Sequence, residues 1–210
     1  LLEIRQGVTA LIGSGGKTTM LYTLAQELSR RGRVLCCTTT HILPPGHMPV
    51  LTDPTAAQLS QGAALPCLCG GSSAVGGMEE LAARWDYVLV EADGSRGLPL
   101  KAHAPHEPVI PDCAGQTVLV VGSGGLGRPV RESVHRPEIF CRLARCGDGD
   151  AADPARTAAV IRAEGLGDKV FLNQADRPDR QEAALALAER LDRPAFIGAL
   201  KRKEWRPCAL

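Results

Sequence analysis

The feature that most constrains this chain is a strand that runs into a glycine turn and then into a helix. Residues 8–19 read V-T-A-L-I-G-S-G-G-K-T-T, so an apolar, β-forming stretch ends in three closely spaced glycines. Such a turn lets backbone N–H groups converge on an anion, and the N-terminus of the following helix adds a partial positive charge. The sequence therefore predicts a nucleotide phosphate site formed by Gly13, Ser14, Gly15, Gly16, Lys17, Thr18 and Thr19.

Two side chains of this segment have expected roles in binding a nucleoside triphosphate. Lys17 is placed to reach the β- and γ-phosphates, and the Thr18 hydroxyl is placed to bind Mg²⁺. The motif in this chain differs from the G-x-x-x-x-G-K-[ST] pattern, because Leu11 occupies the position of the first glycine of that pattern. The shorter G-x-x-G-K-T-T is similar to the phosphate loop of the Mur-ligase family. A chance match in an ordinary loop is the alternative, and the flanking strand and helix argue against it.

Strands and helices alternate along the chain, which predicts an open, mostly parallel sheet with helices on both faces, of the P-loop NTPase-like class. The length suits a single nucleotide-binding domain over residues 1–210. Helices are expected at 20–28, 53–60, 78–84, 137–145, 154–164 and 179–191. Strands are expected at 33–40, 65–69, 86–91, 117–121, 169–173 and 194–197. Residues 95–113 show no period and are expected to form a long functional loop.

Composition narrows the class of partner. The 24 Lys and Arg residues against 23 Asp and Glu give a formal net charge of +1, which offers no electrostatic reason to expect nucleic acid. No stretch approaches the roughly 18 apolar residues of a membrane span, and no signal peptide opens the chain. We therefore expect a cytoplasmic protein with no membrane partner, whose eight cysteines are reduced thiols.

Two carboxylates follow the most strand-like segment, residues 86–91. Glu91 ends this segment, and Asp93 comes two positions later. A carboxylate at the end of a buried strand beside a phosphate loop suits the Mg²⁺ of a nucleotide site, directly or through water. We expect Glu91 to bind Mg²⁺, because E-x-x-G at this point resembles the nickel-insertion GTPases of hydrogenase and urease maturation. Asp93 is then a supporting acid or orients water. The reverse assignment and two solvated loop acids are the alternatives.

A possible base-recognition motif, N-Q-A-D, follows the strand expected at 169–173. In the N-K-x-D motif of G proteins the Asp accepts two hydrogen bonds from guanine, which makes Asn173 and Asp176 candidate nucleotide-binding residues. Gln174 replaces the Lys whose stem stacks on the base. The motif therefore favours GTP slightly over ATP and leaves both open. The alternative is a strand end with an Asn helix cap.

Other polar residues are candidates for contacting a substrate rather than the nucleotide. Thr40 and His41 follow the second expected strand, at the edge of the sheet where phosphates bind. The hydroxyl and the imidazole there suit a γ-phosphate or a Mg²⁺-bound water, although strand-end threonines are also common for their β-propensity alone. The long loop contributes Lys101, His103 and His106. We expect these five residues to lie near a substrate.

Three weaker patterns have simpler explanations. The two loop histidines with Glu107 suit a metal by type, but Pro105 interrupts their spacing, so loop histidines without a metal are the favoured interpretation. Cys67 and Cys69 are candidates for soft-ligand or sulfur chemistry, yet incidental thiols are more usual. Residues 122–127 fit G-x-G-x-x-G but lack the following apolar helix and the later acidic residue of a dinucleotide site, which favours a turn.

The longest motif, E-A-D-G-S-R-G-L-P-L-K-A-H-A-P-H-E-P-V-I-P, resembles the YqeC-like accessory proteins of selenium-dependent molybdenum hydroxylases. The resemblance extends in order over nearly the whole chain, through residues 13–19, 38–42, 91–111, 135–138 and 171–176. It implies a P-loop protein that supports maturation of such a hydroxylase, with the hydroxylase or its cofactor-maturation proteins as partners. It also implies that residues 122–127 belong to a loop leading to H-R-P-E.

Taken with the motifs, the resemblance favours a nucleoside triphosphatase that uses Mg²⁺ with ATP or GTP, in which Lys17, Glu91 and Asp93 are catalytic. One alternative is a small-molecule kinase or ligase that uses the triphosphate to activate a cofactor or a selenium compound. Another is a nucleotide-regulated binding module without turnover.

Overall fold

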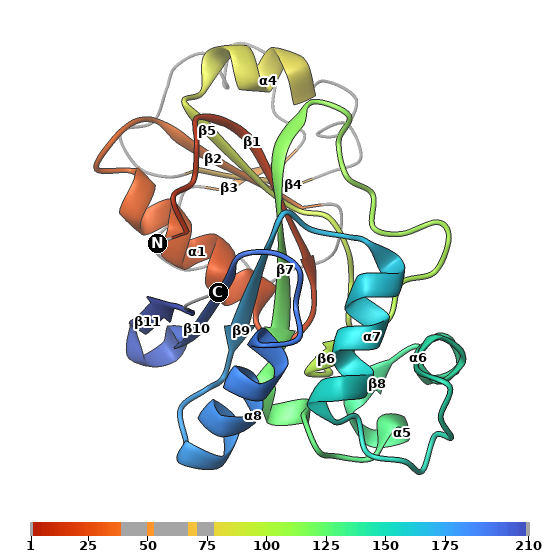
Figure 1. Ribbon diagram of the computed structural model, residues 1–210. Coiled ribbons are helices and arrows are strands. Elements are labelled where there is room, and N and C mark those ends of the chain that lie inside the picture. The colour runs from red at the N-terminus through yellow and green to blue at the C-terminus, as the bar shows by residue number, and fades with distance from the viewer. Residues whose placement is uncertain (1, 39–49, 53–66, 71–77, 209–210) are drawn as a thin grey trace. The chain divides into compact units, whose positions relative to one another are not determined.

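The computed structural model describes residues 2–38, 50–52, 67–70 and 78–208 (Figure 1). These residues form two compact units, each of which we describe by itself. The first unit takes its residues from 1–11, 18–93 and 109–117, and the second from 12–17, 94–108 and 118–210. The glycine turn and Lys17 therefore belong to the second unit. Thr18 and the two candidate carboxylates belong to the first.

Parallel strands form the sheet of the first unit. Their spatial order is β1 (Gly7–Gly13), β5 (Tyr87–Glu91), β2 (Val34–Thr38), β4 (Cys67–Gly70) and β3 (Val50–Thr52). Every neighbouring pair in this order is parallel. All five residues of β5 are buried, as expected for a strand of Y-V-L-V-E that is apolar on both faces. Leu11 pairs with Glu91, so this carboxylate belongs to the last paired residue of β5.

Two helices belong to the described part of the first unit. They are α1 (Lys17–Leu28), whose first residue lies in the second unit, and α4 (Met78–Arg84). The residues that recur at helical spacing along α1, which are Met20, Leu21, Leu24 and Leu28, are all buried, so the amphipathic pattern is confirmed.

The second unit has strands of its own. Their order is β11 (Glu204–Pro207), β10 (Ala195–Ala199), β9 (Lys169–Asn173) and β7 (Ala114–Gly122), of which β7 enters this unit at Val118. The pairs β7–β9 and β9–β10 are parallel, whereas β10–β11 is antiparallel. The sequence did not predict β11, because a four-residue edge strand of E-W-R-P lacks an apolar alternation.

Helices of the second unit pack on one another and on its strands (Figure 1). They are α5 (Val130–Ser133), α6 (Pro137–Ala144), α7 (Pro154–Glu164) and α8 (Pro178–Ala188), with 3-10 turns at Ser123–Gly125 and Leu200–Arg202. Contacts join α6 to α7, α7 to α8, and α8 to β10. The predicted start of α7 is confirmed, since the Asp153 side chain accepts a hydrogen bond from the Arg156 amide. The helix expected at 179–191 ends three residues early, at Ala188.

A small second sheet interrupts the long loop expected at 95–113, which is otherwise irregular. Strand β6 (Leu100–Lys101) pairs in parallel with β8 (Val134–His135), so the segment contains regular structure. Two-residue strands are too short to produce a hydrophobic period, which explains why the sequence missed them. The helix expected at 53–60, together with Thr40 and His41, lies outside the described residues.

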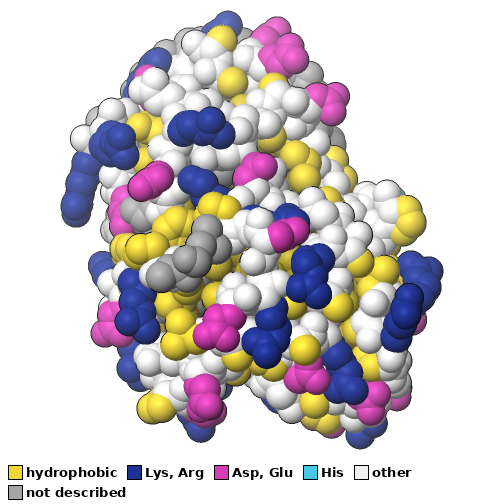
Figure 2. All heavy atoms as spheres, in the orientation of Figure 1, with side chains coloured by type: hydrophobic (Ala, Val, Ile, Leu, Met, Phe, Trp, Pro, Cys, Tyr) yellow, Lys and Arg dark blue, Asp and Glu magenta, His cyan; other side chains and the backbone are white. Residues whose placement is uncertain are grey.

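The surface carries charges of both signs. On the face drawn in Figure 2, Lys and Arg side chains are interspersed with Asp and Glu, as the near-neutral net charge leads one to expect. No helix in the described ranges has the length and apolar character needed to cross a bilayer.

Candidate functional site

The glycine turn is held in place by backbone contacts within the second unit. The Ser14 amide donates to the Val120 carbonyl at 2.8 Å, and the Ser14 hydroxyl donates to the Leu98 carbonyl. Gly16 has φ +127°, a conformation that side chains rarely adopt, and a Cβ on this residue would overlap the Asn173 side-chain nitrogen. Glycine is therefore required at position 16 for both conformational and steric reasons.

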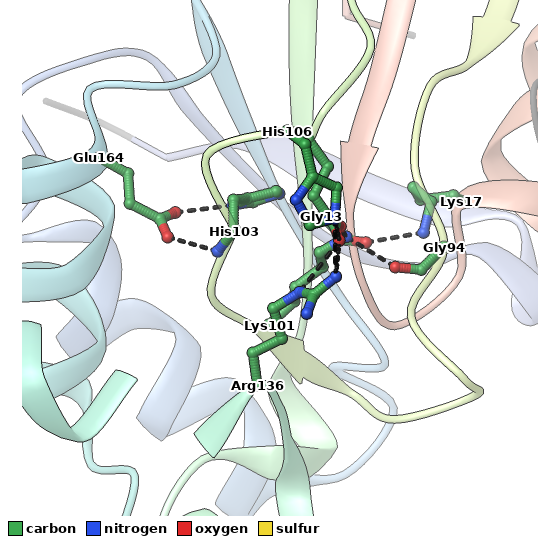
Figure 3. Close-up of polar contacts among 9 residues, drawn as sticks. Gly13, Lys17, Gly94, Lys101, His103, His106, Arg136 and Glu164 are labelled. Carbon is green, nitrogen blue, oxygen red and sulfur yellow. Dashed lines mark hydrogen bonds and ion pairs between the residues drawn. The ribbon is translucent and has the colours of Figure 1, made fainter. Parts of the chain in front are cut away.

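Lys17 lies over the start of this turn. Its Nζ donates a 2.7 Å hydrogen bond to the Gly13 carbonyl, and the residue is only 4% exposed (Figure 3). Lys17 is also the first residue of α1, where backbone N–H groups have no partner within the helix. An ammonium and helix-terminal amides at one turn are the donors that a phosphate chain needs.

Two carboxamides at the end of β9 hold the turn by hydrogen bonds to one of its carbonyl groups. Asn173 Nδ2 donates to the Gly15 carbonyl at 2.8 Å, and Gln174 Nε2 donates to the same oxygen at 3.2 Å. Asn173 Oδ1 accepts a 3.1 Å bond from the Leu200 amide, so both ends of this buried side chain are used. Asn173 and Gln174 therefore both hold the turn through its Gly15 carbonyl.

In the first unit, the candidate metal-binding side chains meet. Thr18 Oγ1 donates to Glu91 Oε2 at 2.9 Å, and Glu91 is 5% exposed. Asp93 is equally buried, so the alternative of two solvated acids is excluded for both carboxylates. Burial, followed by the charges of Cys36 and Glu91, raises the pKa of Tyr22 to about 12. A hydroxyl and a carboxylate in contact are hard oxygen donors of the kind that Mg²⁺ prefers.

The N-Q-A-D segment continues into a cavity within the second unit. Asp176 Oδ1 accepts a 2.9 Å bond from Arg180. Burial raises the carboxyl pKa of Asp176, but its own amide, the Arg180 bond and the charges of Arg180 and Arg202 outweigh burial and lower it. Beside it opens a cavity of about 360 Å³. Its lining includes Ala175, Gln181, Gly198, Glu204, Trp205 and Arg206.

The three candidates from the long loop have different surroundings. Lys101 Nζ donates to the Gly94 carbonyl at 2.6 Å and forms an ion pair with Glu107. His103 is bound through its amide and Nδ1 to the Glu164 carboxylate, at 2.6 and 2.8 Å (Figure 3). Only His106 has a largely exposed side chain, at 75%.

Sequence reasoning missed two partners of this loop. Arg136 forms an ion pair with Glu107, and Glu164 comes from the end of α7. Arg136 stands in the H-R-P-E motif, which was noticed without a role, whereas nothing in the helical pattern of α7 marked Glu164. The side chains of Cys67 and Cys69 lie outside the described part of the chain, so the structure says nothing about their chemistry.

Comparison with known proteins agrees with the motifs and the fold. Residues 9–138, more than half of the chain, match the family described as "YqeC protein". The chain is 38% identical over 156 residues to the "Uncharacterized protein YqeC" of Escherichia coli (strain K12), an alignment that covers 66% of this chain and 61% of that protein. The match therefore spans less than two thirds of the relative's length.

Two solved structures share the fold. One is chloroplast FtsY from Physcomitrella patens, with a TM-score of 0.51 and 14% identity, covering 99% of this chain and 63% of that one. The other is FlhF complexed with GMPPNP/Mg(2+), with a TM-score of 0.51 and 15% identity, covering 98% and 71%. At this level of identity the likeness concerns the fold alone. It confirms the expected class, a P-loop NTPase-like, mostly parallel sheet with helices.

Proposed function

We propose that this chain, which belongs to the YqeC family, binds a nucleoside triphosphate with Mg²⁺ and hydrolyses it. The observation that carries the proposal is the ordered glycine turn. The Lys17 ammonium contacts its first carbonyl, and two carboxamides donate hydrogen bonds to its Gly15 carbonyl. The turn offers backbone amides and an ammonium group to a ligand, and its Gly15 carbonyl is fixed by hydrogen bonds from Asn173 and Gln174. A turn that is already ordered loses little entropy when it binds a phosphate chain.

The roles of the individual residues follow from the needs of phosphoryl transfer, which are mainly positioning and charge neutralisation. Lys17 and the amides of residues 13–19 bind the β- and γ-phosphates. The Thr18 hydroxyl and the Glu91 carboxylate, 2.9 Å apart, hold Mg²⁺, which neutralises charge on the phosphate oxygens. Asp93 is buried close in sequence to Glu91, and we assign it the orientation of the attacking water.

For the base we propose that the Asp176 carboxylate accepts hydrogen bonds from guanine, which favours GTP over ATP. The lowered pKa of Asp176 keeps it an acceptor at neutral pH, and its bond to Arg180 uses Oδ1. Replacing Asp176 by Asn should weaken GTP binding relative to xanthosine triphosphate, because the amide presents a donor to the guanine N–H groups. Equal affinities of the parent protein for GTP and ATP would contradict this assignment.

The wider role rests on the family resemblance. We propose a cytoplasmic protein with residues 1–210 as one nucleotide-binding domain, and a selenium-dependent molybdenum hydroxylase or its cofactor-maturation proteins as clients. Thr40, His41, Lys101, His103 and His106 are the proposed substrate-facing residues. Nucleotide turnover stimulated by a protein partner would support this role. Turnover that requires a small selenium or cofactor compound would support a kinase or ligase, and bound nucleotide without phosphate release would support a regulatory module.

The test is a panel of ATP and GTP with and without Mg²⁺, read by calorimetry and by released phosphate. Lys17→Ala should abolish tight triphosphate binding, because it removes the ammonium that reaches the phosphates. Arg31→Ala is the control, since it also removes one positive charge, from an exposed position beyond the C-terminal end of α1. Unchanged triphosphate affinity in Lys17→Ala would refute the proposed function.

A further inference from the structure

A cluster of cationic side chains surrounds Glu107 in the second unit. Lys101, with a fully buried side chain, pairs with one carboxylate oxygen, and Arg136 pairs with the other through Nε and one terminal nitrogen. The same terminal nitrogen lies 3.4 Å from His106 Nε2. The pairing of β6 with β8 produces this arrangement, because it sets Lys101 opposite His135, the residue before Arg136.

Several positive charges act on this cluster. The cations Arg96, Lys101 and Arg136 act on it, while Glu107 is the carboxylate that these contacts share. Burial first, and then the charges of Lys101, Arg136 and Arg96, lower the pKa of His135 against the opposing charge of Glu107. The local field therefore favours an anion.

Part of this charge faces solvent. The Arg136 side chain is 26% exposed, and its second terminal nitrogen has no hydrogen bond to any described residue. The neighbouring His106 side chain is 75% exposed. Glu107, at 13%, lies behind them and fixes the guanidinium plane through two bonds. A guanidinium held in this way is pre-organised to bind a second oxyanion with its free edge.

The cluster lies next to the glycine turn, within the same unit. The Leu98 carbonyl accepts the Ser14 hydroxyl bond, and a Cβ on Gly15 would meet the Pro99 carbonyl at 2.8 Å. Lys101, two residues later, lines a small enclosed space together with Gly13 and Ser14. Figure 3 shows the Lys17–Gly13 bond and the contacts of Lys101 and Arg136 in one view. Residues 98–101 therefore connect the cluster around Glu107 to the glycine turn.

We propose that Arg136 and His106, with Lys101 and Glu107 behind them, bind the oxyanion group of a second, anionic substrate beside the nucleotide. This inference rests on the proposed nucleotide site and gives the substrate class: a small molecule carrying a phosphate or a carboxylate. Lys101 and Glu107 are positioning residues, since they act through the Arg136 guanidinium. Arg136 and His106 are the groups that touch the ligand.

The first experiment titrates the full chain, saturated with a non-hydrolysable triphosphate analogue and Mg²⁺, with inorganic phosphate and separately with acetate. We expect saturable binding of one of them, weakened at least about tenfold by Arg136→Gln or by His106→Ala, because each removes a donor to a charged group. Binding of phosphate identifies a phosphorylated substrate, and binding of acetate identifies a carboxylate. Arg128→Gln, which removes an exposed arginine of the same unit, should leave the affinity unchanged.

His106→Ala keeps the test valid if Arg136→Gln fails to fold, because the His106 side chain is largely exposed. Repeating the anion titration with the Lys17→Ala protein, without nucleotide, tests the second-substrate site separately from the nucleotide site. If Lys17→Ala leaves triphosphate affinity intact, the nucleotide site is refuted, whereas anion binding that still depends on Arg136 would survive. If neither anion binds, or if the affinity is equal in the parent and both variants, the second-substrate site is refuted alone.

Discussion

Asn173 holds Gly15 in place: its Nδ2 donates a 2.8 Å hydrogen bond to the Gly15 carbonyl across 158 positions of sequence. The same side chain accepts a bond from the Leu200 amide, so one buried carboxamide joins the glycine turn to the end of β10. Asn173, which the sequence makes a candidate for contacting the nucleotide, therefore also fixes the position of the glycine turn. This relationship gives the first of four predictions.

Replacing Asn173 by Ala should lower the free energy of unfolding by about 1–3 kcal/mol, because it leaves the Leu200 amide buried without a partner and the Gly15 carbonyl with a single one. Triphosphate affinity should fall as well, since the turn loses order. Gln174→Ala is the matched variant: its bond to the same carbonyl is 3.2 Å long and less buried, so its effect should be smaller. Urea unfolding and calorimetry measure both quantities, and equal stabilities for the two variants would contradict the prediction.

Replacing Gly16 by Ala should abolish triphosphate binding. The new Cβ would overlap the Asn173 side-chain nitrogen, and alanine is strained at φ +127°. Gly127→Ala separates these causes, because Gly127 has φ +80° with no atom within 4 Å of the added Cβ. The control should therefore lose some stability and retain affinity. Loss of affinity in both variants would contradict the prediction, because the effect would then not depend on the overlap at position 16.

Thr18→Val should remove the Mg²⁺ dependence of triphosphate binding while leaving the helix in place, because it deletes the hydroxyl that contacts Glu91 and keeps the side-chain volume. Thr23→Val is the control on the same helix, since the Thr23 hydroxyl donates to the Thr19 carbonyl one turn earlier. Calorimetric titrations with and without Mg²⁺ compare them. A parent-like metal dependence in Thr18→Val would exclude Thr18 as a ligand.

Acid stability should depend on Glu107. Burial raises its pKa, but the hydrogen bonds and charges of Lys101 and Arg136 outweigh this and hold the folded pKa below the ordinary 4.5. The carboxylate therefore contributes stability that is complete above about pH 4.5 and is lost as the pH falls through the folded value.

Glu107→Gln should lower stability at neutral pH, because Lys101 loses its buried counter-charge, and should flatten the decline below pH 4.5. Glu132→Gln, which alters a half-exposed surface carboxylate, should change neither. Urea unfolding monitored by circular dichroism from pH 7 to pH 3 provides the comparison. The interpretation fails if Glu107→Gln follows the parent curve throughout.

The sequence predicted the parts of the molecule that local pattern determines. The turn at 13–16, the buried strand β5 and the helix at 154–164 each depend on neighbouring residues, and all three are confirmed. The meeting of Thr18 with Glu91 was also foreseeable, since parallel strands bring their carboxyl ends to one edge of a sheet.

Other features depend on contacts between distant segments, which no local pattern encodes. Gln174 looked like a weakened base-recognition residue, and only the fold brings its amide to Gly15. Arg136 acquires a role only when β8 pairs with β6. The edge strand β11 was missed because its four residues carry charge and a proline instead of an apolar period. The roles of Asp93 and Asp176 stay predictions.

The bonds to Gly15 also bear on how the protein is made. A nascent chain that ends before position 173 has produced the glycine turn without the two carboxamides, at positions 173 and 174, that hold it. Such a chain has the motif but not its support, so under the proposed function we expect tight binding of nucleotide only after β9 has emerged.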